Sequence, residues 1–131
     1  MKFILLPFVA WLAAGFLKFS IQYLRSGELK FSEIIGYGGF PSTHTSILSS
    51  AVFSLGLYQG FLTPIFSFGL ACLMVCMIDA QGLRRHVGRQ AVTVNKLDKT
   101  ANLQERMGHT WFELGGGLII GMIVAGFFYL I

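Results

Sequence analysis

Four apolar stretches dominate the chain, and each is long enough to cross a membrane as a helix. No charged residue occurs between Glu33 and Asp79, which leaves room for two spans of about 20 residues with a turn between them. Gly60 and Pro64 mark that turn. The pattern predicts four spans, at approximately residues 3–24, 41–58, 62–78 and 110–131.

Two polar stretches also carry apolar residues in a helical pattern. The connection over residues 26–37 interleaves apolar and charged side chains, which is typical of a short helix at the membrane interface. In the polar loop over residues 79–108, apolar side chains recur at helical spacing: Val87, Ala91, Val94 and Leu97. We therefore expect an all-α membrane protein with one domain over residues 1–131, a bundle of about four transmembrane helices plus interfacial amphipathic helices.

The composition of the 131-residue chain agrees with this class. Hydrophobic residues make up 54% and charged residues 12%, against about 25% charged in an ordinary soluble domain. The net charge of +4 does not indicate nucleic acid, because the basic residues flank the spans without a basic-aromatic pattern. The basic start and apolar core resemble a signal peptide, but no small-x-small cleavage site follows, so we expect a retained helix. Cys72 and Cys76, one helical turn apart, are expected to be small core residues.

Four spans running up and down place the candidate functional residues on one face of the bilayer. These residues lie at the end of the first span, the start of the second, the end of the third and the start of the fourth: Lys18, Arg25, Ser42, Thr43, His44, Asp79, Arg84, His109 and Glu113. Every Lys and Arg except Lys2 lies on the same side. The positive-inside rule predicts that this side is cytoplasmic.

The segment from Gly38 to Ser46 has the residue types of an anion-binding turn. Gly39 and its neighbouring glycine permit φ > 0, Pro41 suits the first turn of a helix, and Ser42 and Thr43 can cap it. The free N–H groups at such a helix start would bind a phosphate. A simple capped turn at the membrane interface is the alternative interpretation.

The charged residues fit the chemistry of phosphate ester cleavage. Lys18 and Arg25 are two helical turns apart and could reach the same phosphate, and Arg84 or Arg85 could clamp it. His109 and Glu113 share a helix face, so the carboxylate can hold one ring nitrogen while the other attacks phosphorus. His44 would protonate the leaving alcohol and then activate water, without a metal.

Structural interpretations of the same residues stay open. Basic residues at span ends often reach to the lipid headgroups, and a His-x3-Glu pair is often a local helix contact. Asp79 could simply pair with an arginine of the following loop. A metal site built from His44, His109, Glu113 and Asp79 is also allowed by residue type, although the surrounding cations argue against a bound dication.

Three short motifs carry a resemblance to a known superfamily. Lys18-x6-Arg25 fits a Lys-x6-Arg-Pro motif with Ser26 in place of proline, and residues 41–44 fit Pro-Ser-Gly-His with threonine for glycine. His109-x3-Glu113 fits the end of Ser-Arg-x5-His-x3-Asp. These residues resemble the type 2 phosphatidic acid phosphatases and vanadium-dependent haloperoxidases.

Two further motifs resemble the divergent bacterial and plant branch of that superfamily over nearly the whole length. They are Asp79-x2-Gly82-x-Arg84 and Gly88-x-Gln90-Ala91. In the third superfamily motif, Asn102 and Leu103 replace Ser-Arg, so the usual arginine is missing there. Arg84 is our candidate replacement, with Arg85 and Arg106 behind it.

The resemblance implies a metal-independent phosphohydrolase without a cofactor, in the inner membrane of a bacterial-type cell. His109 would be the nucleophile, with Glu113 supporting it and His44 acting as acid and base. The residues expected to bind phosphate are Lys18, Arg25, Ser42, Thr43, Arg84 and Arg85, with Asp79, Gly39 and Arg106 in supporting positions.

We therefore expect a membrane lipid phosphatase that acts on a phosphate monoester or pyrophosphate through a phosphohistidine. Phosphatidylglycerol phosphate, phosphatidic acid and polyprenyl phosphates or diphosphates all fit as substrates. The alternative is a non-catalytic membrane protein that binds or transports an anion. The series Gly117-x3-Gly121-x3-Ala125 predicts close helix contact, either inside the bundle or across a homodimer.

Overall fold

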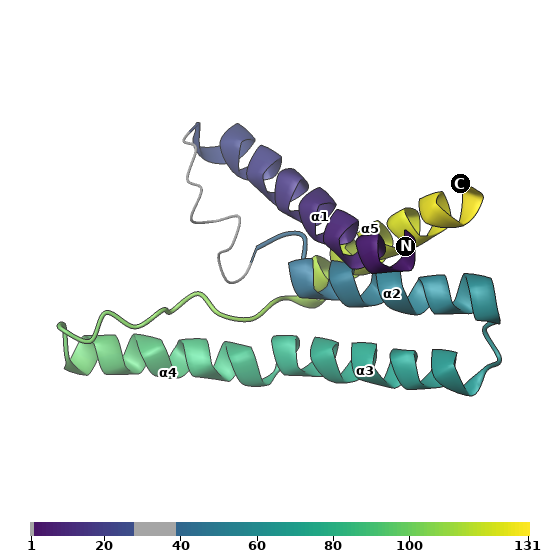
Figure 1. Cartoon of the computed structure of the whole chain (residues 1–131). Coiled ribbons are helices and arrows are strands. Elements are labelled where there is room, and N and C mark those ends of the chain that lie inside the picture. The colour runs from purple at the N-terminus through teal and green to yellow at the C-terminus, as the bar shows by residue number, and fades with distance from the viewer. Residues whose placement is uncertain (1, 28–38) are drawn as a thin grey trace.

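The computed structural model describes residues 2–27 and 39–131, and every regular element in them is a helix. In chain order the helices are α1 (Lys2–Ser26), α2 (Thr43–Gln59), α3 (Pro64–Gln81), α4 (Leu83–Leu97) and α5 (Trp111–Leu130) (Figure 1). This confirms the predicted all-α class. The amphipathic helix expected within residues 79–108 is α4, whereas the one expected over residues 26–37 lies almost wholly outside the described residues.

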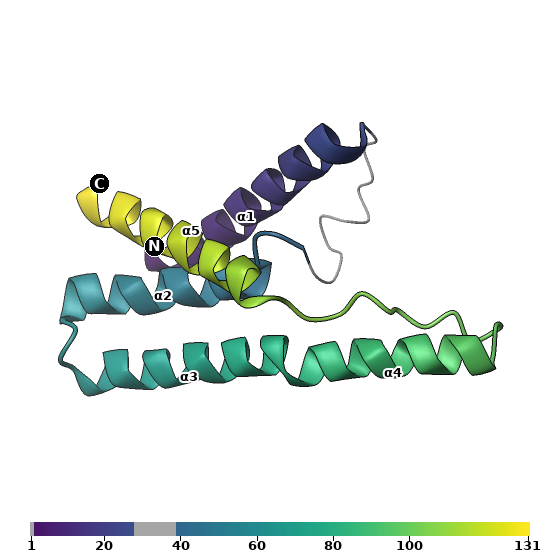
Figure 2. The same ribbon diagram turned by 180° about the vertical axis from the view of Figure 1, so that it is seen from behind.

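Three helical stretches are long and apolar enough to cross a membrane: Phe3–Arg25, Pro64–Leu97 and Trp111–Leu130. The helix at the place of the second predicted span, α2, has 17 residues, or about 26 Å of length, slightly less than the ~30 Å hydrocarbon core. Its buried face is also lined by serines instead of large apolar side chains. Accordingly, α2 is the inner helix of the bundle, and α1, α3 and α5 pack around it (Figures 1 and 2).

Small residues bring α2 and α5 into backbone contact. A Cβ on Gly117 would lie 2.5 Å from the carbonyl oxygen of Ser42, and one on Gly121 would collide with Ser49. The hydroxyl of Ser49 donates to the carbonyls of Ser46 (3.3 Å) and Gly117 (3.3 Å), so this polar face is satisfied by hydrogen bonds. The glycine series thus makes its close contact inside the bundle, and a homodimer would have to use other surfaces.

One face of α1 is buried against the bundle at every fourth residue. Leu6, Ala10 and Ala14 are at most 1% exposed, and the first two form a core with Val124 of α5. Lys18 continues the same stripe and is 7% exposed. The outward side chains of α1 are apolar and exposed, as expected for a lipid-facing surface. A lysine therefore occupies a core position at the C-terminal end of an apolar stripe.

Helices α3 and α4 lie in line, and α4 extends past the start of α2 (Figures 1 and 2). Gly82 separates them with non-helical angles, φ −91° and ψ −86°. Residues 98–110 then run back beside α4. Asn95 holds this return segment through Nδ2 to Leu103 O (2.9 Å) and through Oδ1, which accepts from Leu103 N (2.8 Å). At Gly88 a Cβ would lie 2.5 Å from Glu105 O, so glycine permits the close approach.

Candidate active site

The start of α2 is built by a serine cap. Ser42 has extended backbone angles, and its Oγ accepts from the backbone of Thr45 (3.4 Å) and from the Thr45 hydroxyl (2.9 Å). The helix therefore begins at Thr43, and Pro41 lies before the cap. The expectation that Pro41 occupies the first turn is wrong, because Ser42 takes the capping position after it. Gly39 has φ +85°, as its place in the turn predicted.

Thr43 and His44 lie in the first turn of α2. The hydroxyl of Thr43 is buried and has no hydrogen-bond partner within the described part of the chain. His44 is exposed and lies within electrostatic range of three charged side chains: Arg84, Lys18 and Asp79. The helix start thus holds one unsatisfied hydroxyl and one imidazole near charged side chains.

The start of α5 is fixed by a capping box. Glu113 Oε2 accepts from the backbone of Thr110 (2.8 Å), and the Thr110 hydroxyl accepts from Glu113 N (3.3 Å). The same Oε2 lies 3.5 Å from Nδ1 of His109, a charge contact without hydrogen-bond geometry. The carbonyl of Glu113 accepts from Ser42 N (2.9 Å), which ties the two helix starts together. Glu113 therefore serves the fold and faces His109 at once.

His109 is 6% exposed, and its backbone is tied to the end of α3. Its backbone N–H donates to Ala80 O at the end of α3 (2.9 Å). Burial lowers the pKa of His109, and the charge of Lys18 lowers it further, while the charge of Glu113 opposes both. Since the net direction is downward from 6.5, the imidazole is neutral at neutral pH.

Gly108 makes the position of His109 geometrically feasible. It has φ +80°, and a Cβ there would lie 2.6 Å from Ala80 O and 2.8 Å from Arg85 N. Only glycine allows the chain to press this closely against the junction of α3 and α4. Sequence reasoning missed Gly108, although a glycine two residues before the Thr of a Thr-x2-Glu capping box is a usable signal.

Two cations meet beside the glycine turn. A Cβ on Gly39 would lie 3.8 Å from Cε of Lys18 and 3.6 Å from Nη2 of Arg106. The charge of Lys18 acts on both His44 and His109. The sequence motifs gave Arg106 only a supporting position. In the structure its guanidinium lies beside Gly39, near the side chain of Lys18.

Asp79 and Arg84 form an ion pair at the end of α3. Arg84 Nε lies 2.6 Å from Asp79 Oδ2, and both side chains are about one-third exposed. This is the arginine pairing that the sequence left open for Asp79. The pair uses Nε of the guanidinium, and the charge of Arg84 still reaches His44.

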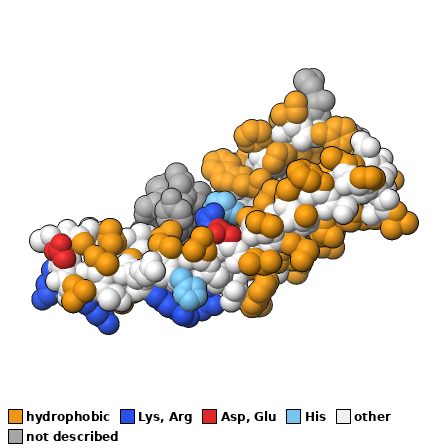
Figure 3. Space-filling view, turned by 90° about the horizontal axis from the view of Figure 1, so that it is seen from below, with side chains coloured by type: hydrophobic (Ala, Val, Ile, Leu, Met, Phe, Trp, Pro, Cys, Tyr) orange, Lys and Arg blue, Asp and Glu red, His pale blue; other side chains and the backbone are white. Residues whose placement is uncertain are grey.

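Most of the predicted site residues gather where the helix ends meet, and one does not. Figure 3 shows basic, acidic and histidine side chains together in the middle of the molecule. Arg25 is exposed in the last turn of α1, and no described contact joins it to this cluster. Arg85 contacts Gly108 through its backbone and Cγ. Among the described residues, no three His, Cys, Asp or Glu side chains form a group that could hold a metal ion.

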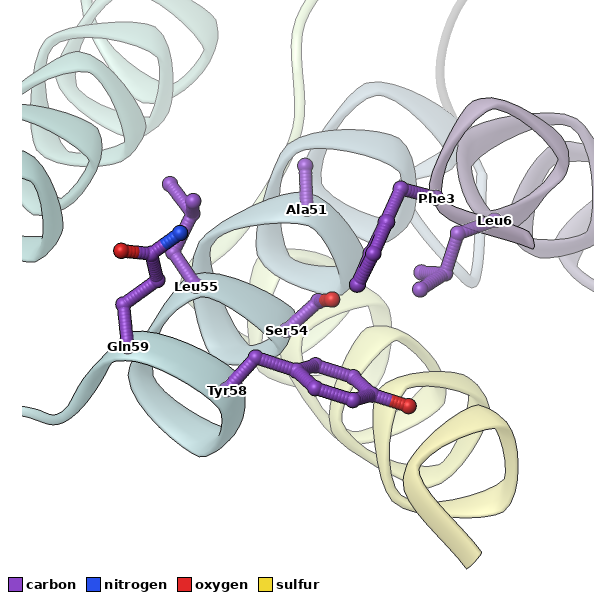
Figure 4. Close-up of a pocket in the computed structure, with 7 residues that line it drawn as sticks. All are labelled: Phe3, Leu6, Ala51, Ser54, Leu55, Tyr58 and Gln59. Carbon is purple, nitrogen blue, oxygen red and sulfur yellow. The ribbon is translucent and has the colours of Figure 1, made fainter. Parts of the chain in front are cut away.

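A cavity of about 280 Å³ lies at the other end of α2, away from these residues (Figure 4). Its lining comes from the start of α1 and from Ala51 to Gln59, roughly 10–22 Å along the helix from His44 at 1.5 Å per residue. The ring of Tyr58 borders it, and the hydroxyl donates to Phe128 O (2.7 Å). The cavity therefore does not coincide with the histidines.

The fold and the cluster define an all-helical membrane protein with two histidines and several cations at one end of its bundle. The chain belongs to the Divergent PAP2 family, whose model matches residues 1–124. This confirms the superfamily branch that the motifs indicated.

A relative in Bacillus subtilis (strain 168) is similar along most of both chains. It is described as the uncharacterized membrane protein YuiD and is 29% identical over 139 aligned residues, covering 88% of each protein. No solved structure matches the chain.

Proposed function

We propose that the protein is a membrane lipid phosphatase that uses His109 as its nucleophile. The observation that carries this proposal is the setting of His109, which is buried, faced by Glu113 and within range of the Lys18 charge. Membership of the Divergent PAP2 family supports a phosphatase-like chemistry.

The phosphate would bind between the start of α2 and the cations. No described hydrogen bond uses the backbone N–H groups of Thr43 and His44, and the Thr43 hydroxyl is also unpaired. These donors lie at the positive end of the helix dipole. Lys18 and Arg106 would neutralise charge on one side of the phosphate, and Arg84, held by Asp79, on another.

The reaction would proceed in two displacements at phosphorus. Nδ1 of His109 faces Glu113, so Nε2 attacks, the N–P bond forms and the P–O bond to the lipid alcohol breaks. His44, which the negative charge of the bound phosphate keeps protonated, gives that proton to the leaving oxygen. In the second step His44 takes a proton from water, the water oxygen bonds to phosphorus, and the N–P bond of the phosphohistidine breaks to release inorganic phosphate.

The place of the site at the helix ends favours a substrate whose headgroup lies at the membrane surface and whose tail lies in the bilayer. A monoester such as phosphatidylglycerol phosphate or phosphatidic acid fits, as does a polyprenyl phosphate or diphosphate. In the up-and-down topology that the sequence predicts, all basic residues except Lys2 fall on the side of the histidines, which favours a cytoplasmic site in an inner membrane. That face favours phosphatidylglycerol phosphate among these substrates.

Phosphate release from a panel of these lipids tests the proposal. The purified protein in mixed detergent and lipid, with chelator present, is compared with His109→Ala and His44→Ala, and with His86→Ala as a matched control on exposed α4. Release from one lipid that is lost in the first two variants, and kept in the control, is the expected result. Lipid phosphate binding without release, or release that survives His109→Ala, would favour the anion-binding alternative instead.

A further inference from the structure

The surface of α4 is divided into three faces, of which the first is already occupied. Gly88 and Ala91 are buried, and Gly88 packs against Glu105 and Met107 of the return segment. Asn95 holds the same segment by hydrogen bonds. This face therefore belongs to the hairpin formed by α4 and residues 98–110.

The second face is an apolar stripe that nothing in the described structure covers. It consists of Leu83, Val87, Val94 and Leu97, which are 64%, 40%, 40% and 84% exposed. At 100° per residue they fall within an arc of about 80°. A stripe of this kind is unfavourable in water and suits the boundary between headgroups and acyl chains.

The third face is basic. Arg85, Arg89 and Lys96 fall within an arc of about 40°, roughly 140° from the apolar stripe, and α4 contains no acidic residue. Figure 3 shows Lys and Arg gathered along one edge of the protruding arm, with hydrophobic side chains beside them. When the stripe enters the interface, the basic face is turned toward the headgroups and water, where long basic side chains can reach headgroup phosphates.

The length of the α3–α4 rod places α4 beyond the hydrocarbon core. The rod has 34 residues, or about 51 Å, against ~30 Å for the core. Gly82 interrupts the helix between the two parts and is the point at which the direction can change. Where α3 spans the bilayer, α4 emerges at the headgroup level with an uncovered apolar stripe. Because the two helices lie in line (Figures 1 and 2), a bend at Gly82 is needed to lay this stripe on the membrane surface.

We propose that α4 docks on an anionic lipid surface, inserting the stripe of Leu83, Val87, Val94 and Leu97 and placing its basic face among the headgroup phosphates. The charge of this face selects anionic lipids over a second copy of the same helix, because two copies of a helix with no acidic residue repel each other. The proposal does not depend on the reaction at His109.

Spin-label depth measurements on the full chain test this docking. Cys72→Ser and Cys76→Ser provide a background in which Val94→Cys carries the label on the apolar stripe and Gln104→Cys carries it on the exposed return segment. The protein is reconstituted at high dilution in phosphatidylcholine vesicles with and without phosphatidylserine. Collisions with oxygen and with a water-soluble nickel chelate report depth, and circular dichroism checks the fold.

We expect the label at position 94 to become oxygen-accessible and shielded from nickel when phosphatidylserine is present, while the label at 104 stays in water. In Lys96→Gln, about fivefold more phosphatidylserine should be needed for the same change in accessibility, since one cation near an anionic surface contributes about fivefold in binding. Lys99→Gln, outside the helix, should change it less. A label at 94 that stays in water in both lipids, or that shows dipolar broadening from a second copy, would overturn the proposal.

Discussion

The carboxylate of Glu113 lies 3.5 Å from Nδ1 of His109 while it also accepts a hydrogen bond from the backbone of Thr110. One side chain thus starts a helix and faces the candidate nucleophile. The structural and catalytic interpretations of the His-x3-Glu pair are therefore not exclusive. They can be separated only by a substitution that keeps the cap and removes the charge.

Glu113→Gln is that substitution. Its amide oxygen can still accept from Thr110 N, so the free energy of unfolding should change by less than about 1 kcal/mol. The negative charge beside His109 is lost, so phosphate release should fall at least tenfold, or about 1.4 kcal/mol of transition-state stabilisation. Initial rates and thermal unfolding in detergent measure the two effects. Equal activity in wild type and Glu113→Gln would leave the residue with a capping role alone.

The pH dependence of the rate should follow the protonation of His109. Burial lowers its pKa below 6.5, so the neutral nucleophile persists to lower pH than in a free histidine. We expect kcat/KM to fall as the pH decreases through this lowered pKa, with an inflection below about 6.5. The pH profile of phosphate release measures it.

Lys18 gives this prediction a control, because its charge also lowers the pKa of His109. In Lys18→Met the inflection should move upward, toward the ordinary histidine value. The free energy of unfolding should also depend on the protonation of His109. A histidine whose folded pKa is depressed destabilises the fold when it is protonated, so the unfolding temperature should decrease below about pH 6.5. An inflection that moved downward in Lys18→Met would contradict the assignment.

Gly108→Ala should destabilise the protein and stop the reaction. The new Cβ would lie 2.6 Å from Ala80 O and 2.8 Å from Arg85 N, and φ is +80°. The strained backbone alone costs about 1–3 kcal/mol, and relief of the contacts would displace His109. Gly115→Ala is the matched control, since a Cβ there meets nothing within 4 Å and alanine favours a helix by up to about 1 kcal/mol. The unfolding temperature should decrease in Gly108→Ala and stay equal or rise in Gly115→Ala, and phosphate release should be lost in Gly108→Ala alone.

Much of the fold was predictable because it depends on local patterns. Apolar runs indicated the helices, and the recurrence of Val87, Ala91, Val94 and Leu97 indicated α4. The capping role of Ser42 also follows from residue type. The start of α2 was placed two residues early, since a sequence pattern does not decide which of several residues before a helix becomes the cap.

The candidate site was predictable in part, because the up-and-down topology alone brings the helix ends together. What the sequence could not supply were contacts through backbone atoms. The Ala80 carbonyl that holds His109, and the Glu113 carbonyl that holds Ser42, have no side-chain signature. The convergence of Arg106 with Lys18 beside Gly39 depends on the path of the return segment, which is set by packing on α4.

Lys18→Met separates the needs of the fold from those of the reaction. Lys18 occupies the fourth position of a stripe whose other members are Leu6, Ala10 and Ala14, and it is 7% exposed. Methionine has a similar length and suits this apolar stripe, so the packing is kept while the cost of burying a charge is removed. We therefore expect an unfolding temperature close to that of the wild type, together with a loss of phosphate release of about 100-fold or more. Calorimetry in detergent and initial rates measure both. A variant that unfolds earlier and keeps its specific activity would show that the Lys18 ammonium serves the fold and not the phosphate.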